Sequence, residues 1–187
     1  MTDAPGAGLH APTLQQIRDA QVRIRPYVRH TPLVELDVGL PDRRIYLKLE
    51  TLQPIGAFKL RPALNAILTR NMAALRQGVA VASSGNMAYG MAWAAHAVGV
   101  PMAAYMVADA PQAKIDGVRR LGGEVRFISS ATWWDYITDV QRPAHAELLI
   151  NPVTDPAVLA GNGTIGLDIM EDLPSVDGVF TPFGGGS

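Results

Sequence analysis

The sequence predicts an α/β fold built on a parallel sheet. Short apolar runs with strand character alternate with amphipathic or alanine-rich stretches of helical spacing along most of the chain. Polar or glycine-rich turns follow three of the apolar runs, at 51–58, 83–86 and 184–187. Alternation at this spacing is typical of parallel strands joined by right-handed helical crossovers.

The first predicted element is a helix over residues 14–28. Thr13 and Gln16 form a capping-box pair in front of an amphipathic stretch. An extended segment around Pro32, a strand over 43–50 and a turn-rich loop over 51–58 follow. A second helix is expected from Lys59 to about residue 76, because its leucine, isoleucine and methionine residues recur at helical spacing.

The middle and the end of the chain supply the strands of the predicted sheet. Strands are expected at 78–84, 101–108, 124–129, 147–153 and 176–182. The expected intervening helices cover 86–98, 109 to about 121, a stretch that begins at Thr132, and 156 to about 173. Asp155 is the expected N-cap of the last helix, because Pro156 suits the first helical position.

The composition excludes several classes of function. The chain has 187 residues, a net charge of −1 and no cysteine. Disulfides, thiolate catalysis and cysteine zinc sites are therefore excluded, and balanced charge indicates neither a nucleic-acid nor a membrane partner. Residues 1–12 read as a flexible tail without a signal pattern, and no apolar run is long enough to cross a bilayer. A cytoplasmic location is expected.

Two features of the sequence could suggest a dinucleotide site or a metal site, but structural roles are the preferred interpretation. Residues 161–166, GNGTIG, match a dinucleotide-binding glycine pattern, but DPAVLA separates them from the preceding strand and reads as the start of a helix. Glycines that let this helix pack closely on the sheet are the preferred interpretation. The four histidines have no ligand spacing, so no metal site is predicted.

Lys59 is the first candidate for chemistry. It lies where a loop becomes a helix, and the positive end of the helix dipole disfavours a charged ammonium there. A lysine whose neutral amine is favoured suits covalent chemistry on carbonyl groups. Phe58 offers an aromatic face beside it. The alternative is an exposed surface lysine.

Two further turns are candidates for binding anions. Ser83, Ser84 and Asn86 place hydroxyl and amide groups at a helix start, where unsatisfied N–H groups favour a carboxylate; plain N-capping by Ser84 or Asn86 is the alternative. The terminal glycines can turn successive N–H groups onto a phosphate. A tight turn, or an artificial linker, is the alternative for them.

Taken together and in order, several stretches resemble one enzyme family. They are LKLETLQPIGAFKLRPA, ASSGNMAYG, APQAKIDGVRRLGGEV and NPVTDPAVLAGNGTIGLDI, with DGVFTPFGGGS at the end. They resemble the threonine and serine dehydratases and serine racemases, which are pyridoxal-phosphate enzymes of fold type II. The resemblance runs from about His30 to the last residue.

The resemblance implies a role for each candidate residue. Lys59 matches the lysine that holds pyridoxal 5'-phosphate, Phe58 the residue that packs on its ring, and Asn86 the residue that bonds the ring oxygen. Ser83, Ser84, Gly85 and Asn86 match the loop that receives the substrate carboxylate. The phosphate loop is matched by Gly184, Gly185, Gly186 and Ser187.

Departures from the family pattern keep the reaction open. Ile55 stands where the family has threonine, Pro62 where it has glycine, and Met87 where it has histidine. Ser84 matches the serine that racemase members use as a second acid or base. The expected activity is ammonia loss from threonine or serine, with an amino-acid racemase or a catalytically silent remnant as alternatives.

The resemblance also implies a domain organisation. The small domain covers 76–146, and it is inserted into a larger α/β domain made of 1–75 and 147–187, which is incomplete here. Family members are longer, and they carry divalent-cation ligands in the part that follows. No metal ligand is therefore assigned in this chain. A full-length homodimer acting on a small amino acid is expected.

Overall fold

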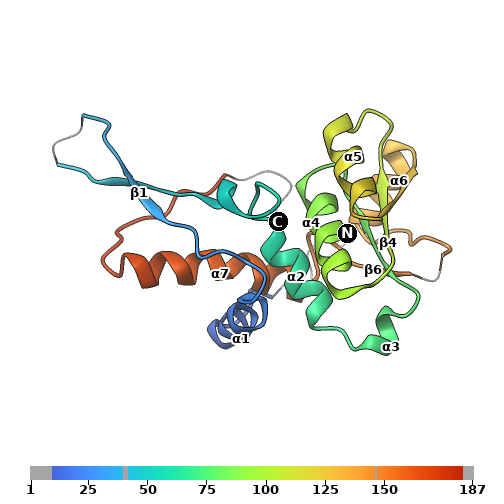
Figure 1. Cartoon of the computed structure of the whole chain (residues 1–187), viewed down its shortest axis with the longest axis horizontal. Helices are drawn as coiled ribbons and strands as arrows, with labels where there is room; N and C mark the ends of the chain where they lie inside the picture. Colours follow the sequence, from blue (N-terminus) through green and yellow to red (C-terminus); the bar gives the residue numbers. More distant parts are fainter. Residues whose placement is uncertain (1–9, 40–41, 146, 183–187) are drawn as a thin grey trace, which may run out of the picture.

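Four parallel strands form the central sheet of the computed structural model, in the order β5-β4-β3-β6 (Figure 1). The model describes residues 10–39, 42–145 and 147–182. The strands are β3 (Val79–Ala82), β4 (Met102–Met106), β5 (Glu124–Phe127) and β6 (Leu148–Leu149). All three pairings are parallel, with Val79 opposite both Met102 and Leu148. The predicted α/β fold with a parallel sheet is confirmed.

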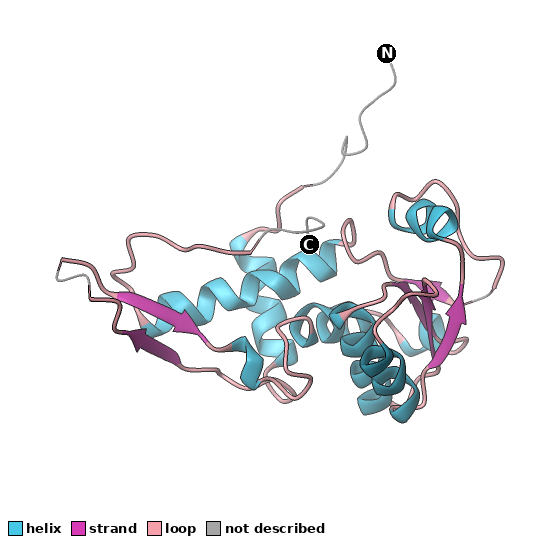
Figure 2. Ribbon diagram, turned by 90° about the horizontal axis from the view of Figure 1, so that it is seen from above, coloured by secondary structure: helices cyan, strands magenta, loops and turns pink. Residues whose placement is uncertain are grey.

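Helices cover both faces of this sheet (Figure 2). They are α4 (Asn86–Val98), α5 (Gln112–Arg120) and α6 (Ser130–Ile137). Val79, Val81 and Met106 share the main core with α4 and α5, whereas alternate residues such as Ala80 and Tyr105 pack with α6. This alternation follows from the two-residue period of a strand, so each face receives its own apolar set.

A second layer consists of three helices that lie beside the sheet (Figure 1). They are α1 (Leu14–Ile24), α2 (Leu60–Leu68) and α7 (Pro156–Asp172). A Cβ on Gly161 of α7 would lie 2.5 Å from the Cα of Pro62 in α2, and one on Gly163 would lie 2.8 Å from Ile17 of α1. Gly161 therefore brings α7 against the backbone of α2, and Gly163 leaves room for the Ile17 side chain of α1.

Strands β1 (Leu33–Leu36) and β2 (Ile45–Lys48) form an antiparallel ribbon that projects beyond α7 (Figure 1). Val34 pairs with Leu47 and Leu36 with Ile45. These four side chains share one face of the ribbon, because residues two apart on a strand point the same way. Each is between 38% and 44% exposed, so this face of the ribbon is apolar and open.

Two predicted helices are shorter than expected. The capping box of Thr13 and Gln16 is present, but α1 ends at Ile24 instead of residue 28. Pro26 explains this, because proline lacks the N–H and restricts the residue before it. The helix expected from Lys59 to residue 76 splits into α2 and α3 (Met72–Leu75), and Asn71 caps the second piece.

Two other predicted boundaries were wrong. Helix α6 is capped by Ser129, whose side chain accepts from the Thr132 backbone, so Thr132 is inside the helix instead of at its start. The strand expected at 176–182 is not formed, since no strand follows α7 in the described part of the chain. Phe180 in that segment is fully exposed, and the segment pairs with no described strand.

The remaining boundaries agree with expectation to within a few residues. Asp155 caps α7 with Pro156 as its first residue, and α4 begins at Asn86 as predicted. A 3-10 turn (Glu50–Leu52) opens the loop that leads to Lys59. Among the helices of the described residues, none is both long enough and apolar enough to span a membrane.

Candidate active site

Lys59 is the N-cap residue of α2 and is half-buried. The Ala63 amide donates to the Lys59 carbonyl at 3.3 Å, while Pro62 in the first turn has no N–H to satisfy. Burial lowers the pKa of the Lys59 ammonium. The sequence prediction of a favoured neutral amine was based on the helix dipole, and in the structure the cause is removal of the amine from solvent. The Lys59 Nζ lies 4.7 Å from the centroid of the Phe58 ring.

The two other lysines of the chain are engaged elsewhere. Lys48 Nζ donates to the Thr31 carbonyl at 2.6 Å and to Asp172 at 3.1 Å, and its side chain is 7% exposed. Lys114 lies on α5, with Nζ 5.5 Å from the centroid of the Tyr89 ring. Lys59 is therefore the lysine that combines a loop-to-helix turn with a lowered amine pKa.

The Ser83–Asn86 turn follows β3 at the carboxyl edge of the sheet. The chain runs outward from β3 through β4 to β5, and then returns to place β6 on the other side of β3. In open α/β sheets, ligands bind outside the carboxyl ends of the strands where the order reverses in this way. The turn therefore occupies the position at which this topology favours a ligand.

The polar groups of this turn do not cap the helix that follows. Gly85 is the N-cap residue of α4, and no described side chain caps it. The Ser83 hydroxyl accepts from the Gly85 amide at 3.3 Å, and the Ser84 hydroxyl accepts from the Val107 amide at 3.1 Å. Plain N-capping by Ser84 or Asn86, the alternative that the sequence left open, is thus not observed, and exposed Asn86 stands at the helix start.

Helix α4, which begins at Asn86, packs on the turn that carries Lys59. Gly90, one helical turn after Asn86, packs on the start of α2: a Cβ there would lie 2.7 Å from the Lys59 carbonyl oxygen. Met87, for which the family resemblance had suggested a histidine, is 3% exposed and belongs to the main core. The predicted phosphate residues Gly184, Gly185, Gly186 and Ser187 lie outside the described residues.

A buried arginine, which the sequence reading did not single out, fixes the start of α2. Arg61 is 1% exposed and donates from Nε and Nη2 to both oxygens of Glu50, each at 2.8 Å. Its Nη2 also donates to Asp168 Oδ2 of α7 at 2.7 Å, and its Nη1 to Thr164 at 3.3 Å. Burial alone would lower the Arg61 pKa, but the two carboxylates raise it overall, so the guanidinium stays charged.

Neighbouring polar groups complete this ionic network. Glu50 also accepts from the Thr31 hydroxyl at 2.6 Å, and Asp168 accepts from Gln21 at 3.1 Å. His30 lies 2.7 Å from Asp172, which Lys48 also contacts. The network thus ties α1, α2, α7 and the start of the ribbon together around a buried charge.

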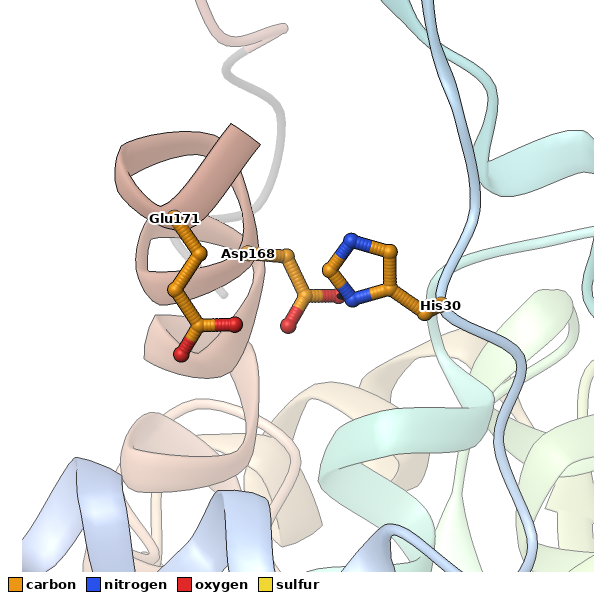
Figure 3. Close-up of side chains that lie close together, drawn as sticks. All are labelled: His30, Asp168 and Glu171. Carbon is orange, nitrogen blue, oxygen red and sulfur yellow. Dashed lines mark ion pairs between the residues drawn. The ribbon is translucent and has the colours of Figure 1, made fainter. Parts of the chain in front are cut away.

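His30, Asp168 and Glu171 also have the composition of a cation site (Figure 3). Their potential ligand atoms lie within 4.8 Å of one another, at a cavity of about 300 Å³ between α1 and α7. Asp168 already accepts from Arg61, and Gln21 donates to Asp168 and Glu171. These contacts account for the cluster as part of the ionic network, and Arg25 and Arg29 at the same cavity disfavour a cation.

The glycine-rich GNGTIG segment lies inside α7. Gly161 and Gly163 pack against α2 and α1, and a Cβ on Gly166 would meet nothing within 4 Å. The close-packing role that the sequence favoured is therefore observed, although the partners are helices instead of the sheet. Thr164, within the same segment, donates its hydroxyl to the Gly161 carbonyl.

Comparison with known proteins shows the family of this chain. The family model described as pyridoxal-phosphate dependent enzyme matches residues 24–187. The chain is 39% identical over 176 residues to an L-threonine ammonia-lyase of Geobacter sulfurreducens, covering 91% of this chain and 43% of the relative. It is 36% identical to a beta-hydroxyaspartate dehydratase of Paracoccus denitrificans, covering 95% of this chain and 58% of the relative.

A solved structure has the same fold. Maize serine racemase superposes with a TM-score of 0.82 at 31% identity, over 90% of this chain and 52% of that one. The chain spans about half the length of the curated relatives that it matches. The matches to the family model and to these relatives cover nearly all of the chain, so it belongs to the family of pyridoxal-phosphate-dependent enzymes.

Proposed function

We propose that this protein, in its natural full length, is a pyridoxal-phosphate-dependent ammonia-lyase. Its substrate would be a β-hydroxy amino acid, threonine or serine, and its products a 2-keto acid and ammonia. The observation that carries the proposal is the contact between α4 and the Lys59 turn: Gly90, one helical turn after the Ser83–Asn86 turn, packs against the carbonyl of Lys59. The ammonia-lyase and dehydratase among the relatives support the choice of reaction.

The residues present fit the cofactor. Lys59 supplies a half-buried amine of lowered pKa beside the Phe58 ring, and the uncapped start of α4 supplies N–H donors. A Cβ built on Gly85 would meet nothing within 4 Å, so there is room at the turn itself. Lys59, Phe58 and Asn86 would hold the cofactor. When bound, pyridoxal phosphate supplies an electron sink for the pair left at the substrate α-carbon.

Each turn has its own task in this proposal. The Ser83–Asn86 turn would bind the substrate carboxylate through the N–H groups at the start of α4 and through its polar side chains. The Lys59 Nζ would take the α-proton as general base, because its lowered pKa keeps more of the amine neutral at physiological pH. The β-hydroxyl leaves as water. Hydrolysis then consumes one water as ammonia is released, so the net products are the 2-keto acid and ammonia.

Replacement of Lys59 tests this proposal. In the protein expressed from its natural gene, Lys59→Ala should abolish both the visible absorbance of the lysine-bound cofactor and keto-acid production. Lys114→Ala is the matched control, because Lys114 lies on α5 against Tyr89 and should retain both. Persistent absorbance with unchanged turnover in Lys59→Ala would assign the cofactor to another residue.

An amino-acid racemase is the second candidate, and one observation favours it. The Ser84 hydroxyl accepts the Val107 amide, which would stabilise negative charge on its oxygen and leaves its own proton available for donation. Ser84 would then return a proton to the face of the α-carbon opposite Lys59. Incubation of the protein with L-serine separates the candidates: keto acid and ammonia support the lyase, and D-serine supports the racemase.

A further inference from the structure

We propose that Gly90 is the positioning residue that fixes Lys59 relative to the Ser83–Asn86 turn. This role rests on the proposed function, in which Lys59 takes a proton from a substrate held by that turn. Gly90 would act without touching the substrate. It would set how far the carboxylate turn stands from the amine.

The geometry of α4 places both groups on one surface. Asn86 and Gly90 are four residues apart, so they lie one above the other on the same helix face. A Cβ at Gly90 would meet the Lys59 carbonyl oxygen at 2.7 Å, the Lys59 carbonyl carbon at 3.1 Å and Ile55 Cδ1 at 3.3 Å. Two of these three atoms are backbone, which cannot rotate away as a side-chain end could.

The turn that carries Lys59 is also held by a second helix. Gly161 of α7 approaches the next residues of the same turn, where its Cβ would lie 2.9 Å from the Arg61 carbonyl oxygen. The Arg61 side chain adds its bonds to Glu50 and Asp168. A methyl group at position 90 would therefore displace α4 and its turn more readily than it would displace Lys59.

The expected displacement of α4 is small, but its effect on the reaction rate is large. Normal van der Waals separation requires α4 to move outward by about half an ångström, and misplacement on the order of 1 Å costs about 100-fold in rate. Gly90→Ala should therefore lower kcat/KM by roughly 10-fold to 100-fold. The same movement admits water to the amine, so the Lys59 pKa should rise toward its ordinary value, since burial is what lowers it.

Three glycine variants test the proposal in the protein expressed from its natural gene. Gly90→Ala is compared with Gly161→Ala, which disturbs α2 from the α7 side, and with Gly166→Ala, whose Cβ meets nothing within 4 Å. The Lys59 pKa is measured without cofactor, by competitive acetylation over a pH series with mass-spectrometric readout for each lysine. The mass-spectrometric readout is specific to each position, so Lys59 is measured separately from Lys48 and Lys114. Thermal unfolding and kcat/KM are measured in parallel.

Support for the proposal is a raised Lys59 pKa and reduced kcat/KM in Gly90→Ala, with neither in Gly166→Ala. Gly161→Ala should lower thermal stability, but it should change the Lys59 pKa and kcat/KM less than Gly90→Ala does. The proposal is overturned if Gly90→Ala leaves the Lys59 pKa unchanged, or if Gly161→Ala changes it as much at equal loss of stability.

A milder variant covers the case in which Gly90→Ala does not fold. Ile55→Val removes only the Cδ1 methyl that faces Gly90 and should raise the Lys59 pKa slightly; no change there counts against the proposal. The acetylation experiment needs neither cofactor nor turnover. Absorbance of the unaltered protein with pyridoxal phosphate reports separately on the proposed function, so the two failures are distinguishable.

Discussion

The sheet and the three-helix layer beside it share one apolar core, but the helix layer adds a buried ionic network. Around β3 and β4 the chain buries alanine, valine and methionine side chains against α4, α5 and α6. In the layer of α1, α2 and α7, a fully buried arginine bonds two carboxylates from segments 11 and 107 residues away. Apolar burial with a local pattern stabilises the first region, whereas the second combines apolar residues of the same core, such as Leu64 and Ile67, with polar partners as far as 107 residues away in sequence.

This difference predicts that single substitutions will lower stability by unequal amounts in the two regions. Loss of one apolar group leaves a cavity that neighbours partly fill, whereas loss of one ionic partner leaves a buried charge without compensation. The Lys59 turn belongs to the polar region, since Arg61 lies two residues after the lysine. Damage to the network should therefore affect the candidate site before it affects the sheet.

The largest expected effect comes from Arg61→Ala. It strips Glu50 and Asp168 of their main partner, and breaking such a buried pair typically costs about 3–5 kcal/mol. Urea unfolding followed by circular dichroism should show a correspondingly lower midpoint. Arg44→Ala is the matched control, because its ion pair with Glu35 is exposed and should leave the midpoint unchanged. Equal loss in both variants would remove the distinction between the two regions.

Helix caps should show an intermediate effect of similar size in both regions. Ser129→Ala removes the bond to the Thr132 amide in α6, and Asp155→Ala removes the bond to the Ala157 amide in α7. Loss of such a cap costs about 1 kcal/mol. Asp155→Ala should cost somewhat more, since Asp155 also pairs with Arg70. Urea midpoints measure both, and a much larger loss at Ser129 would contradict the view that caps act locally.

The smallest expected effect is a loss of stability at low pH. The hydrogen bond from His30, and then that from Lys48, holds the pKa of Asp172 below its ordinary 3.8. A carboxyl whose pKa is lower in the folded than in the unfolded state stabilises the fold above its unfolded pKa, and this contribution disappears as pH falls through the folded pKa. Stability should therefore decline below about pH 4, and less steeply in Asp172→Asn. Urea midpoints at pH 2 to 6 check the slope, and identical slopes would exclude Asp172 as the cause.

Most helix starts around the sheet were predictable, because the residues that indicate them are local in sequence. Asn86 begins α4 where the sequence placed it, and Asp155 with Pro156 begins α7. Errors arose where a competing local feature was overlooked, such as Pro26 at the end of α1 and Ser129 before α6. The strand expected at 176–182 failed for another reason, since a strand exists only when a partner pairs with it.

The candidate site residues were proposed from the sequence and remain a prediction, whereas the network that supports them was not predicted. Lys59 and the Ser83–Asn86 turn were proposed from residue type and position, and Gly90 packs α4, which follows that turn, against Lys59. The network of Arg61, Glu50 and Asp168 was not predicted, although all three residues lie in stretches that suggested the family. A buried arginine requires carboxylate partners, but sequence spacing cannot choose them among 17 acidic residues when the contacts span more than a hundred positions.

Helix α7 concentrates its partners on a single stripe. Gly161 meets α2, Thr164 and Asp168 meet Arg61, and Asp172 meets Lys48, at successive steps of three or four residues. One inserted residue near the middle of α7 would rotate everything after it by about 100°. Such an insertion would turn Asp168 and Asp172 away from their partners at once, so the length of this helix between Gly161 and Asp172 should tolerate no change.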